Sequence, residues 1–97
     1  MPRQKKQADF DSDVLLRSKP VNALVSLRDK GKTWYASLVA KKIDCTYPHT
    51  IKILKEFERA GFVSEEHKGR TNILRLTDKG EEVAKTLETL LRQLKKA

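Results

Sequence analysis

The 97-residue chain is long enough for one compact domain and too short for two. Its 21 lysines and arginines against 13 acidic residues give a formal net charge of +8. Such an excess indicates either a polyanionic partner, chiefly nucleic acid or an anionic membrane surface, or charge that serves only solubility. The one cysteine, Cys45, excludes an intramolecular disulfide, and no apolar stretch approaches the roughly 20 residues of a membrane span, so we expect a cytoplasmic protein.

Residues 1–13 are predicted to form a flexible N-terminal arm. The segment is mostly polar, and Arg3, Lys5 and Lys6 make its tip cationic. The arm either adds contacts to phosphate or serves as a solubilising tail.

Two helices are predicted in the first half of the chain, over residues 19–30 and 36–43. Ser18 suits the N-cap of the first helix, and Pro20 fits its first turn, where the missing amide hydrogen is not needed. Gly31 supplies a stop. The second helix is indicated by apolar residues that recur at three- and four-residue spacing.

Several chemically distinctive residues have ordinary structural explanations. The β-prone run Lys32–Tyr35 is either a short strand or the extended entry to the second helix, and Trp34 within it is expected in the core rather than as a base-stacking platform. Cys45 is expected to be a small buried hydrophobe rather than a redox switch. His49 and His67 are too few, and lack suitably spaced neighbours, to predict a metal site.

A third helix is predicted over residues 47–60. Thr46 can cap it, Pro48 fits its first turn, and Gly61 can take the left-handed conformation at its end. The helical wheel places four residues on an inward face: Thr50, Ile53, Leu54 and Phe57.

A hairpin and a long final helix follow. Residues 62–67 and 72–76 are β-prone and flank a short polar turn with a glycine, residues 68–71. Thr77 is the expected N-cap of a last helix that extends to Lys96.

The order helix, strand, helix, helix, strand, strand, helix predicts a mainly α fold with a small β-hairpin wing, that is, a winged helix-turn-helix with a long C-terminal helix. Val39–Val63 (VAKKIDCTYPHTIKILKEFERAGFV) resembles the winged helix-turn-helix segment of MarR-like and related archaeal-type transcription regulators. Leu74–Gly80 (LRLTDKG) resembles the end of their wing, and the resemblance covers about residues 20–85. Asp44 stands where the family's turn usually has glycine, a conformation that Asp tolerates better than most residues.

The resemblance implies a transcriptional regulator that binds double-stranded DNA, with the helix at about 47–60 in the major groove and a wing at 67–72 at the minor groove. Lysines on the outward helix face can reach phosphates or guanine edges, apolar residues there can contact a thymine methyl group, and an arginine on the wing suits a narrow minor groove. The alternatives are an ordinary solvated helix face and ordinary turn composition. The predicted contacts are Tyr47, Pro48, His49, Ile51, Lys52 and Lys55 on the helix, Lys68 and Arg70 on the wing, and Ser37 and Lys42 on the second helix.

The final helix carries a heptad-like apolar seam. Val83, Leu87, Leu90 and Leu94 recur at spacings of four, three and four residues, with Leu91 alongside. The seam either packs on its own domain or pairs with a second copy. Because the helix is about 27 Å long at 1.5 Å per residue, longer than a small domain covers, a homodimer is favoured. A two-fold dimer predicts a palindromic site with half-sites about one DNA turn apart.

The expected domains are an arm (1–13), a winged helix DNA-binding domain (14–80) and a C-terminal dimerisation helix (81–97). We expect a sequence-specific, nucleoid-associated regulator without a cofactor, and any small-molecule effector would have to bind at the dimer interface. Two alternatives stay open: a non-specific chromatin-like architectural protein, and a winged helix used for protein contacts in a transcription or replication assembly. An enzyme is not expected, because the sequence shows no nucleophile–base set, phosphate-binding glycine loop or metal cluster.

Overall fold

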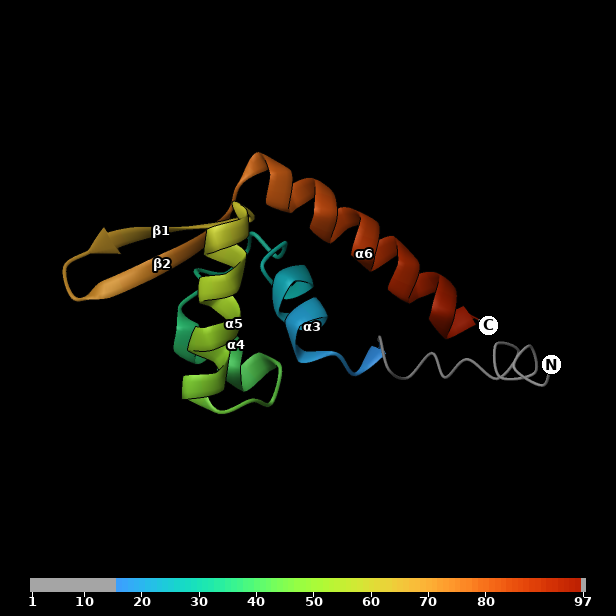
Figure 1. Ribbon diagram of the computed structural model, residues 1–97, viewed down its shortest axis with the longest axis horizontal. Coiled ribbons are helices and arrows are strands. Elements are labelled where there is room, and N and C mark those ends of the chain that lie inside the picture. The colour runs from blue at the N-terminus through green and yellow to red at the C-terminus, as the bar shows by residue number, and fades with distance from the viewer. Residues whose placement is uncertain (1–15, 97) are drawn as a thin grey trace.

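The computed structural model describes residues 16–96, so the predicted arm at residues 1–13 lies outside the described part. The fold is mainly α with one antiparallel hairpin, which confirms the predicted fold class (Figure 1). No helix within residues 16–96 is long and apolar enough to cross a membrane. The elements are α3 (Lys19–Ser26), α4 (Ala36–Lys42), α5 (Tyr47–Ala60), β1 (Val63–Lys68), β2 (Thr71–Leu76) and α6 (Asp78–Lys96).

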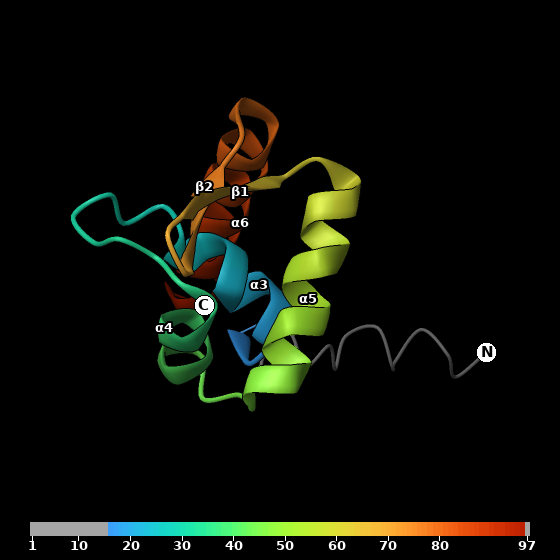
Figure 2. The ribbon, with the colours of Figure 1, turned by 90° about the vertical axis from the view of Figure 1, so that its left-hand side faces the viewer.

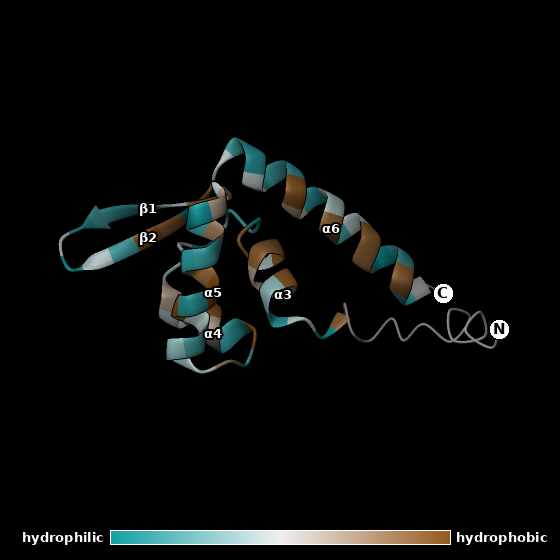
Figure 3. Cartoon of the chain, viewed as in Figure 1, coloured by the Kyte–Doolittle hydropathy of each residue, from teal (hydrophilic) through white to brown (hydrophobic). Residues whose placement is uncertain are grey.

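α3 occupies the centre of the molecule. It packs against α6 on one side and α4 on the other, and α4 in turn packs against α5 (Figure 1). The hairpin projects away from α6, on the opposite side of the body. In Figure 3, hydrophobic and hydrophilic positions alternate along α6, as expected for a helix with only one face covered.

α3 begins as predicted but ends four residues early, at Ser26 instead of residue 30. The Ser18 hydroxyl caps it by accepting a hydrogen bond from the amide of Val21 at 3.3 Å. After Ser26 the chain tightens into three-residue turns, in which the amides of residues 27, 28 and 29 bond to carbonyls three positions back. The carbonyl of Asp29 then accepts the indole N–H of Trp34 at 3.0 Å, so this turn, and not Gly31, ends the helix.

The bounds of α5 agree with the sequence prediction because both of its ends are specified locally. The Thr46 hydroxyl accepts the amide of His49 at 3.4 Å, and Gly61 closes the helix with φ 84°. In the turn before α5, Asp44 has φ 56°, the left-handed conformation expected for this substitute for glycine.

Both strands extend one residue further toward the turn than predicted, which makes the turn tighter, and β1 begins at Val63, one residue later than predicted. Lys68 pairs with Thr71, so both residues belong to the strands and only Gly69 and Arg70 form the turn. Gly69 has φ 61°, which a glycine adopts without strain. The β-prone run at 32–35 contributes a single bridge, in which Trp34 accepts the amide of Leu74 at 2.8 Å.

The core forms where α3, α4 and α5 meet the base of the hairpin. Leu24, Val39 and Thr50 are fully buried, and the hydroxyl of Thr50 is satisfied by donating to the carbonyl of Thr46 at 2.8 Å. Ala84 of α6 belongs to the same core, with none of its surface exposed. The first half of α6 is therefore part of the globular domain.

A close junction joins the end of α5 to the start of α6. Thr77 donates its amide to the carbonyl of Phe62 at 3.0 Å and its hydroxyl to the carbonyl of Gly61 at 2.6 Å. The same hydroxyl accepts the amide of Gly80 at 3.0 Å, as predicted for an N-cap. A Cβ atom on Gly80 would lie 1.9 Å from the Phe62 carbonyl oxygen, so only glycine permits this approach. The two sequence segments that carry the family resemblance thus meet in one junction.

Arg28 links the end of α3 to α6 across 53 and 60 positions of sequence. Its Nε donates to Glu81 at 3.0 Å and its Nη1 donates to Glu88. Lys30 lies 3.5 Å from the other oxygen of Glu81. The hydrogen bond from Arg28 lowers the pKa of Glu81 below its ordinary value and raises the pKa of Arg28.

Candidate nucleic-acid interface

α5 has one buried and one exposed face, divided as the helical wheel predicted. Ile53 and Leu54 are buried with Thr50, and Phe57 is half-buried. The side chains at 47, 48, 49, 52 and 55 are exposed, and Ile51 is half-buried. Tyr47 leaves 54% of its surface exposed, which is unusual for so large a side chain. The N-terminal half of α5 therefore presents a surface on which a partner can bind.

A groove of about 320 Å³ separates α5 from the hairpin. It brings together four residues predicted as DNA contacts from three different elements: Ser37, Tyr47, Ile51 and Arg70. Figure 2, seen from the hairpin side, shows α5 to the right of the hairpin and α4 below it. The surface is thus continuous from the start of α5 to the tip of the hairpin.

The groove also contains residues that the sequence prediction missed, namely Tyr35, Glu65, Thr71 and Asn72. Tyr35 precedes α4 in an extended conformation, so its side chain points away from the core that holds Trp34. This alternation is the signal that would have found Tyr35. The other three residues required the pairing register of the two strands, which the sequence did not predict.

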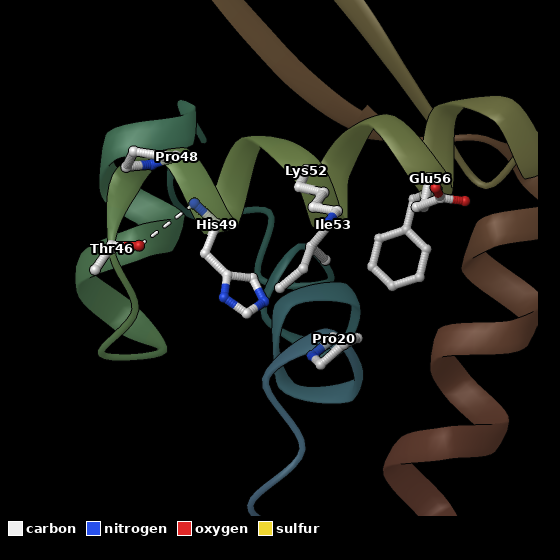
Figure 4. Close-up of a pocket in the computed structure, with 8 residues that line it drawn as sticks. Pro20, Thr46, Pro48, His49, Lys52, Ile53 and Glu56 are labelled. Carbon is white, nitrogen blue, oxygen red and sulfur yellow. Dashed lines mark hydrogen bonds between the residues drawn. The ribbon is translucent and has the colours of Figure 1, made fainter.

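A second hollow lies on the other side of α5 (Figure 4). Its volume is about 580 Å³, and Pro20 of α3 forms the wall opposite α5. Pro48, His49 and Lys52 line this hollow, whereas Tyr47 and Ile51 line the groove beside the hairpin. The residues predicted on α5 therefore form an arc across its exposed face and do not converge on one pocket.

Ion pairs partly neutralise the charge of α5. Lys55 lies 3.7 Å from Glu58, and Arg59 lies 2.9 Å from Glu56. Within residues 16–96, Lys52 forms no ion pair, so it is the cation of α5 most available to an anionic partner.

The hairpin tip is cationic and exposed. Lys68 and Arg70 flank Gly69 and, in the described part of the chain, form no ion pair. Lower on the hairpin, Arg75 is held by Glu66 at 3.0 Å. The unpaired positive charge of this element is therefore concentrated at its tip.

The two residues predicted on α4 lie at different places. Ser37 lines the groove beside the hairpin. Lys42 is exposed but lines a separate hollow together with Arg28 and Glu88. The structure thus does not bring Lys42 to the groove that holds Ser37.

Trp34 has the core position expected from the sequence, whereas Cys45 is less buried than expected. Trp34 is 3% exposed, which leaves no face for base stacking, and Lys32 lies 5.7 Å from the centre of its ring. Cys45 is half-buried against the core. Over residues 16–96, no group of three or more His, Cys, Asp or Glu residues is placed to hold a metal ion.

No family model matches the sequence. An uncharacterised protein of Archaeoglobus fulgidus is 31% identical over 81 residues, which cover 80% of this chain and 85% of that protein. The crystal structure of AF1382 from Archaeoglobus fulgidus superposes with a TM-score of 0.73 at 30% identity, covering 78% of this chain and 87% of that chain. MepR of Staphylococcus aureus has a TM-score of 0.72 at 16% identity, covering 81% of this chain and 60% of MepR.

These similarities differ in what they show. The likeness to MepR shows the fold, and this chain spans only 60% of that longer protein. The archaeal relative matches in sequence over nearly its whole length. With the helix order, hairpin and α5–α6 junction described above, the chain has the winged helix-turn-helix fold predicted from its sequence and belongs to the winged helix-turn-helix family with this archaeal relative.

Proposed function

We propose that this protein is a transcriptional regulator that binds double-stranded DNA in a sequence-specific manner. The observation that carries the proposal is the continuous exposed surface from the N-terminal half of α5 to the cationic hairpin tip. The net charge of +8 favours a polyanion at such a surface. MepR, which shares the fold, is a transcription regulator of a multidrug efflux pump.

In this proposal the N-terminal half of α5 enters the major groove. Lys52, which is exposed and forms no ion pair with another described residue, contacts a phosphate or a guanine edge. Tyr47 and His49 supply hydrogen bonds, and Pro48 and Ile51 contact thymine methyl groups. Lys55 is a weaker candidate, because it must leave Glu58 to reach DNA.

The hairpin turn follows the DNA backbone to the minor groove. Arg70 is placed at the tip, where the negative potential of a narrow minor groove attracts a guanidinium group. Lys68 beside it neutralises a phosphate. Ser37, which lines the protein groove between α5 and the hairpin, donates a hydrogen bond to the DNA backbone. We do not place Lys42 at the centre of this interface, because it lies nearer α3.

We further propose that the protein is a homodimer through α6. Leu90 is 37% exposed, and Val83, Leu87 and Leu94 are each only half-buried, so an apolar strip stays open to a second copy. Leu91 is 9% exposed in the single chain and contributes less than the sequence pattern predicted. In this arrangement α6 serves both the domain core and the contact between copies, and the dimer presents two α5 helices to a palindromic site.

Selection of bound duplexes from a random pool, repeated at two salt concentrations, tests the proposed function. A regulator enriches a palindrome with half-sites about 34 Å apart, and the enrichment survives the higher salt. An architectural protein binds with a steep salt dependence and returns a featureless pool. A winged helix used only for protein contacts binds no duplex at either salt, which would contradict the proposal.

A further inference from the structure

Glu65 of β1 has no partner for its carboxylate among residues 16–96, and it lies in the surface that faces the proposed DNA. The other three glutamates of α5 and the hairpin are held in ion pairs: Glu56 with Arg59, Glu58 with Lys55 and Glu66 with Arg75. Glu65 forms no ion pair or side-chain hydrogen bond within residues 16–96. An unpaired negative charge at a surface that binds a polyanion requires an explanation.

The strand register places the Glu65 side chain in the groove between α5 and the hairpin. Val63 and Glu65 share one face of β1, because side chains alternate along a strand. Glu65 pairs with Leu74, which is 3% exposed, so this face is the one that packs toward the core. Glu65 is half-buried and, with Tyr47 and Arg70, lines the groove. It is the one acidic residue among the groove's lining side chains.

The position of this carboxylate matters because of what approaches it when DNA docks. If α5 lies in the major groove of DNA and the hairpin tip at the minor groove, the DNA backbone that separates these two DNA grooves passes over the protein groove between α5 and the hairpin. Phosphate oxygens carry negative charge and offer no hydrogen to a carboxylate. A phosphate that approaches Glu65 is repelled, whereas the amino group of cytosine or adenine is a donor that a carboxylate accepts.

We propose that Glu65 is a specificity-determining residue, which weakens the binding of non-cognate DNA more than that of the cognate site. This inference rests on the proposed function. Non-specific binding depends almost entirely on phosphate contacts, so repulsion in the groove acts on it in full. At the cognate site, base contacts fix the register, and the backbone is held where Glu65 faces a donor or solvent.

Glu65→Gln tests the proposal, because it removes the charge and keeps the shape. Glu82→Gln is the matched control: Glu82 is exposed on α6, has no ion-pair partner within residues 16–96, and loses the same charge away from the groove. Dissociation constants are measured for the wild type and both variants, on the duplex enriched from the random pool and on a scrambled duplex of equal length. Thermal unfolding of each variant confirms that the fold is intact.

We expect Glu65→Gln to tighten binding to the scrambled duplex about two- to fivefold, the range for one exposed charge pair. The ratio of the two dissociation constants should fall by a similar factor, and Glu82→Gln should leave that ratio unchanged. Weaker binding of the enriched duplex by Glu65→Gln would also support the proposal, since it means that the carboxylate accepts a hydrogen bond there.

Equal effects of the two variants on both duplexes would overturn the inference and leave the proposed function intact. If selection returns no preferred duplex, there is no cognate site for Glu65 to favour, and the inference fails together with sequence-specific binding. Failure of the wild type to bind any duplex at low salt would instead overturn the proposed function and this inference together.

Discussion

At the scale of single residues, Gly80 is the position at which one added carbon would do most damage. Its missing Cβ lets the first turn of α6 lie against the backbone of Phe62 at the end of α5. The hydroxyl of Thr77 completes the junction by bonding on both sides. Because α5 carries the proposed DNA contacts and α6 the proposed dimer contact, this junction sets the relative placement of the two functions.

Gly80→Ala should destabilise the protein by about 3 kcal/mol or more, at the upper end of overpacking effects, because backbone must move to admit the methyl group. Chemical denaturation measures the change. Gly31→Ala is the control, since its Cβ would meet only the end of the Asp29 side chain at 3.3 Å and the residue has no positive φ. Similar stabilities of the two variants would show that the junction is looser than described.

At the scale of elements, α6 is attached by apolar packing on one face and by Arg28 on its flank. Since the pKa of Glu81 is lowered in the folded protein, the ion pair contributes stability at pH values above the ordinary pKa of 4.5. That contribution is lost as the pH falls through the lowered pKa, when Glu81 becomes protonated. The attachment of α6 should therefore weaken in acid.

Glu81→Gln should lower the melting temperature at pH 7 by a few degrees and have a smaller effect at pH 3, because below the ordinary pKa of 4.5 part of the stabilisation by the ion pair is already lost. Thermal unfolding at the two pH values measures both effects. Glu82→Gln, with no ion pair among the described residues, should change the melting temperature little at either pH. A difference between Glu81→Gln and the wild type that is as large at pH 3 as at pH 7 would mean that the ion pair is not its source.

The open strip of α6 gives a second prediction at this scale. Leu90→Glu should yield monomers in sedimentation. It should change the stability of the single folded chain little, because Leu90 is 37% exposed there. Leu91→Glu should instead destabilise the fold, since Leu91 is only 9% exposed in the single chain, before any second copy binds. A Leu90→Glu protein that still sediments as a dimer would place the contact elsewhere.

The elements show which features of this protein are readable from sequence. The bounds of α5 were predicted fully, because Thr46 and Gly61 specify both ends within a few residues. The end of α3 was not, because the turn after Ser26 is fixed by a hydrogen bond from Trp34, whose effect on the helix has no local signal. The hairpin turn was predicted two residues too long, since β propensity alone does not reveal that Lys68 pairs with Thr71.

In the candidate site, too, features set by local sequence were predictable, and features set by tertiary packing were not. Exposure of the outward residues of α5 followed from helical periodicity, and the structure confirms it for all of them but Ile51, which is half-buried. Glu65 and Tyr35 reach the groove only through the packing of the hairpin on α5, and the bridge at Trp34. The link from Arg28 to Glu81 spans 53 positions, which no periodicity within one helix can predict.

At the scale of the whole molecule, the proposed functions lie at opposite ends. The hairpin and the outer face of α5 lie on one side, and the far half of α6 extends on the other (Figure 1). A dimer formed through α6 would leave both proposed DNA surfaces free. The central proposal is that the protein contacts DNA through α5 and the hairpin tip.

Titration of DNA with Lys52→Ala/Arg70→Ala tests that claim most directly. The control is Lys85→Ala/Lys95→Ala, which removes two exposed positive charges from α6. The control variant therefore has the same net charge as the first variant. We predict that the first variant binds the enriched duplex about thirtyfold or more weakly, at roughly 1 kcal/mol or more for each of the two lost contacts, with an unchanged melting temperature. The control should bind nearly as the wild type does. Equal loss of affinity in the two variants would show that only net charge matters, and would contradict a DNA-binding site at α5 and the hairpin.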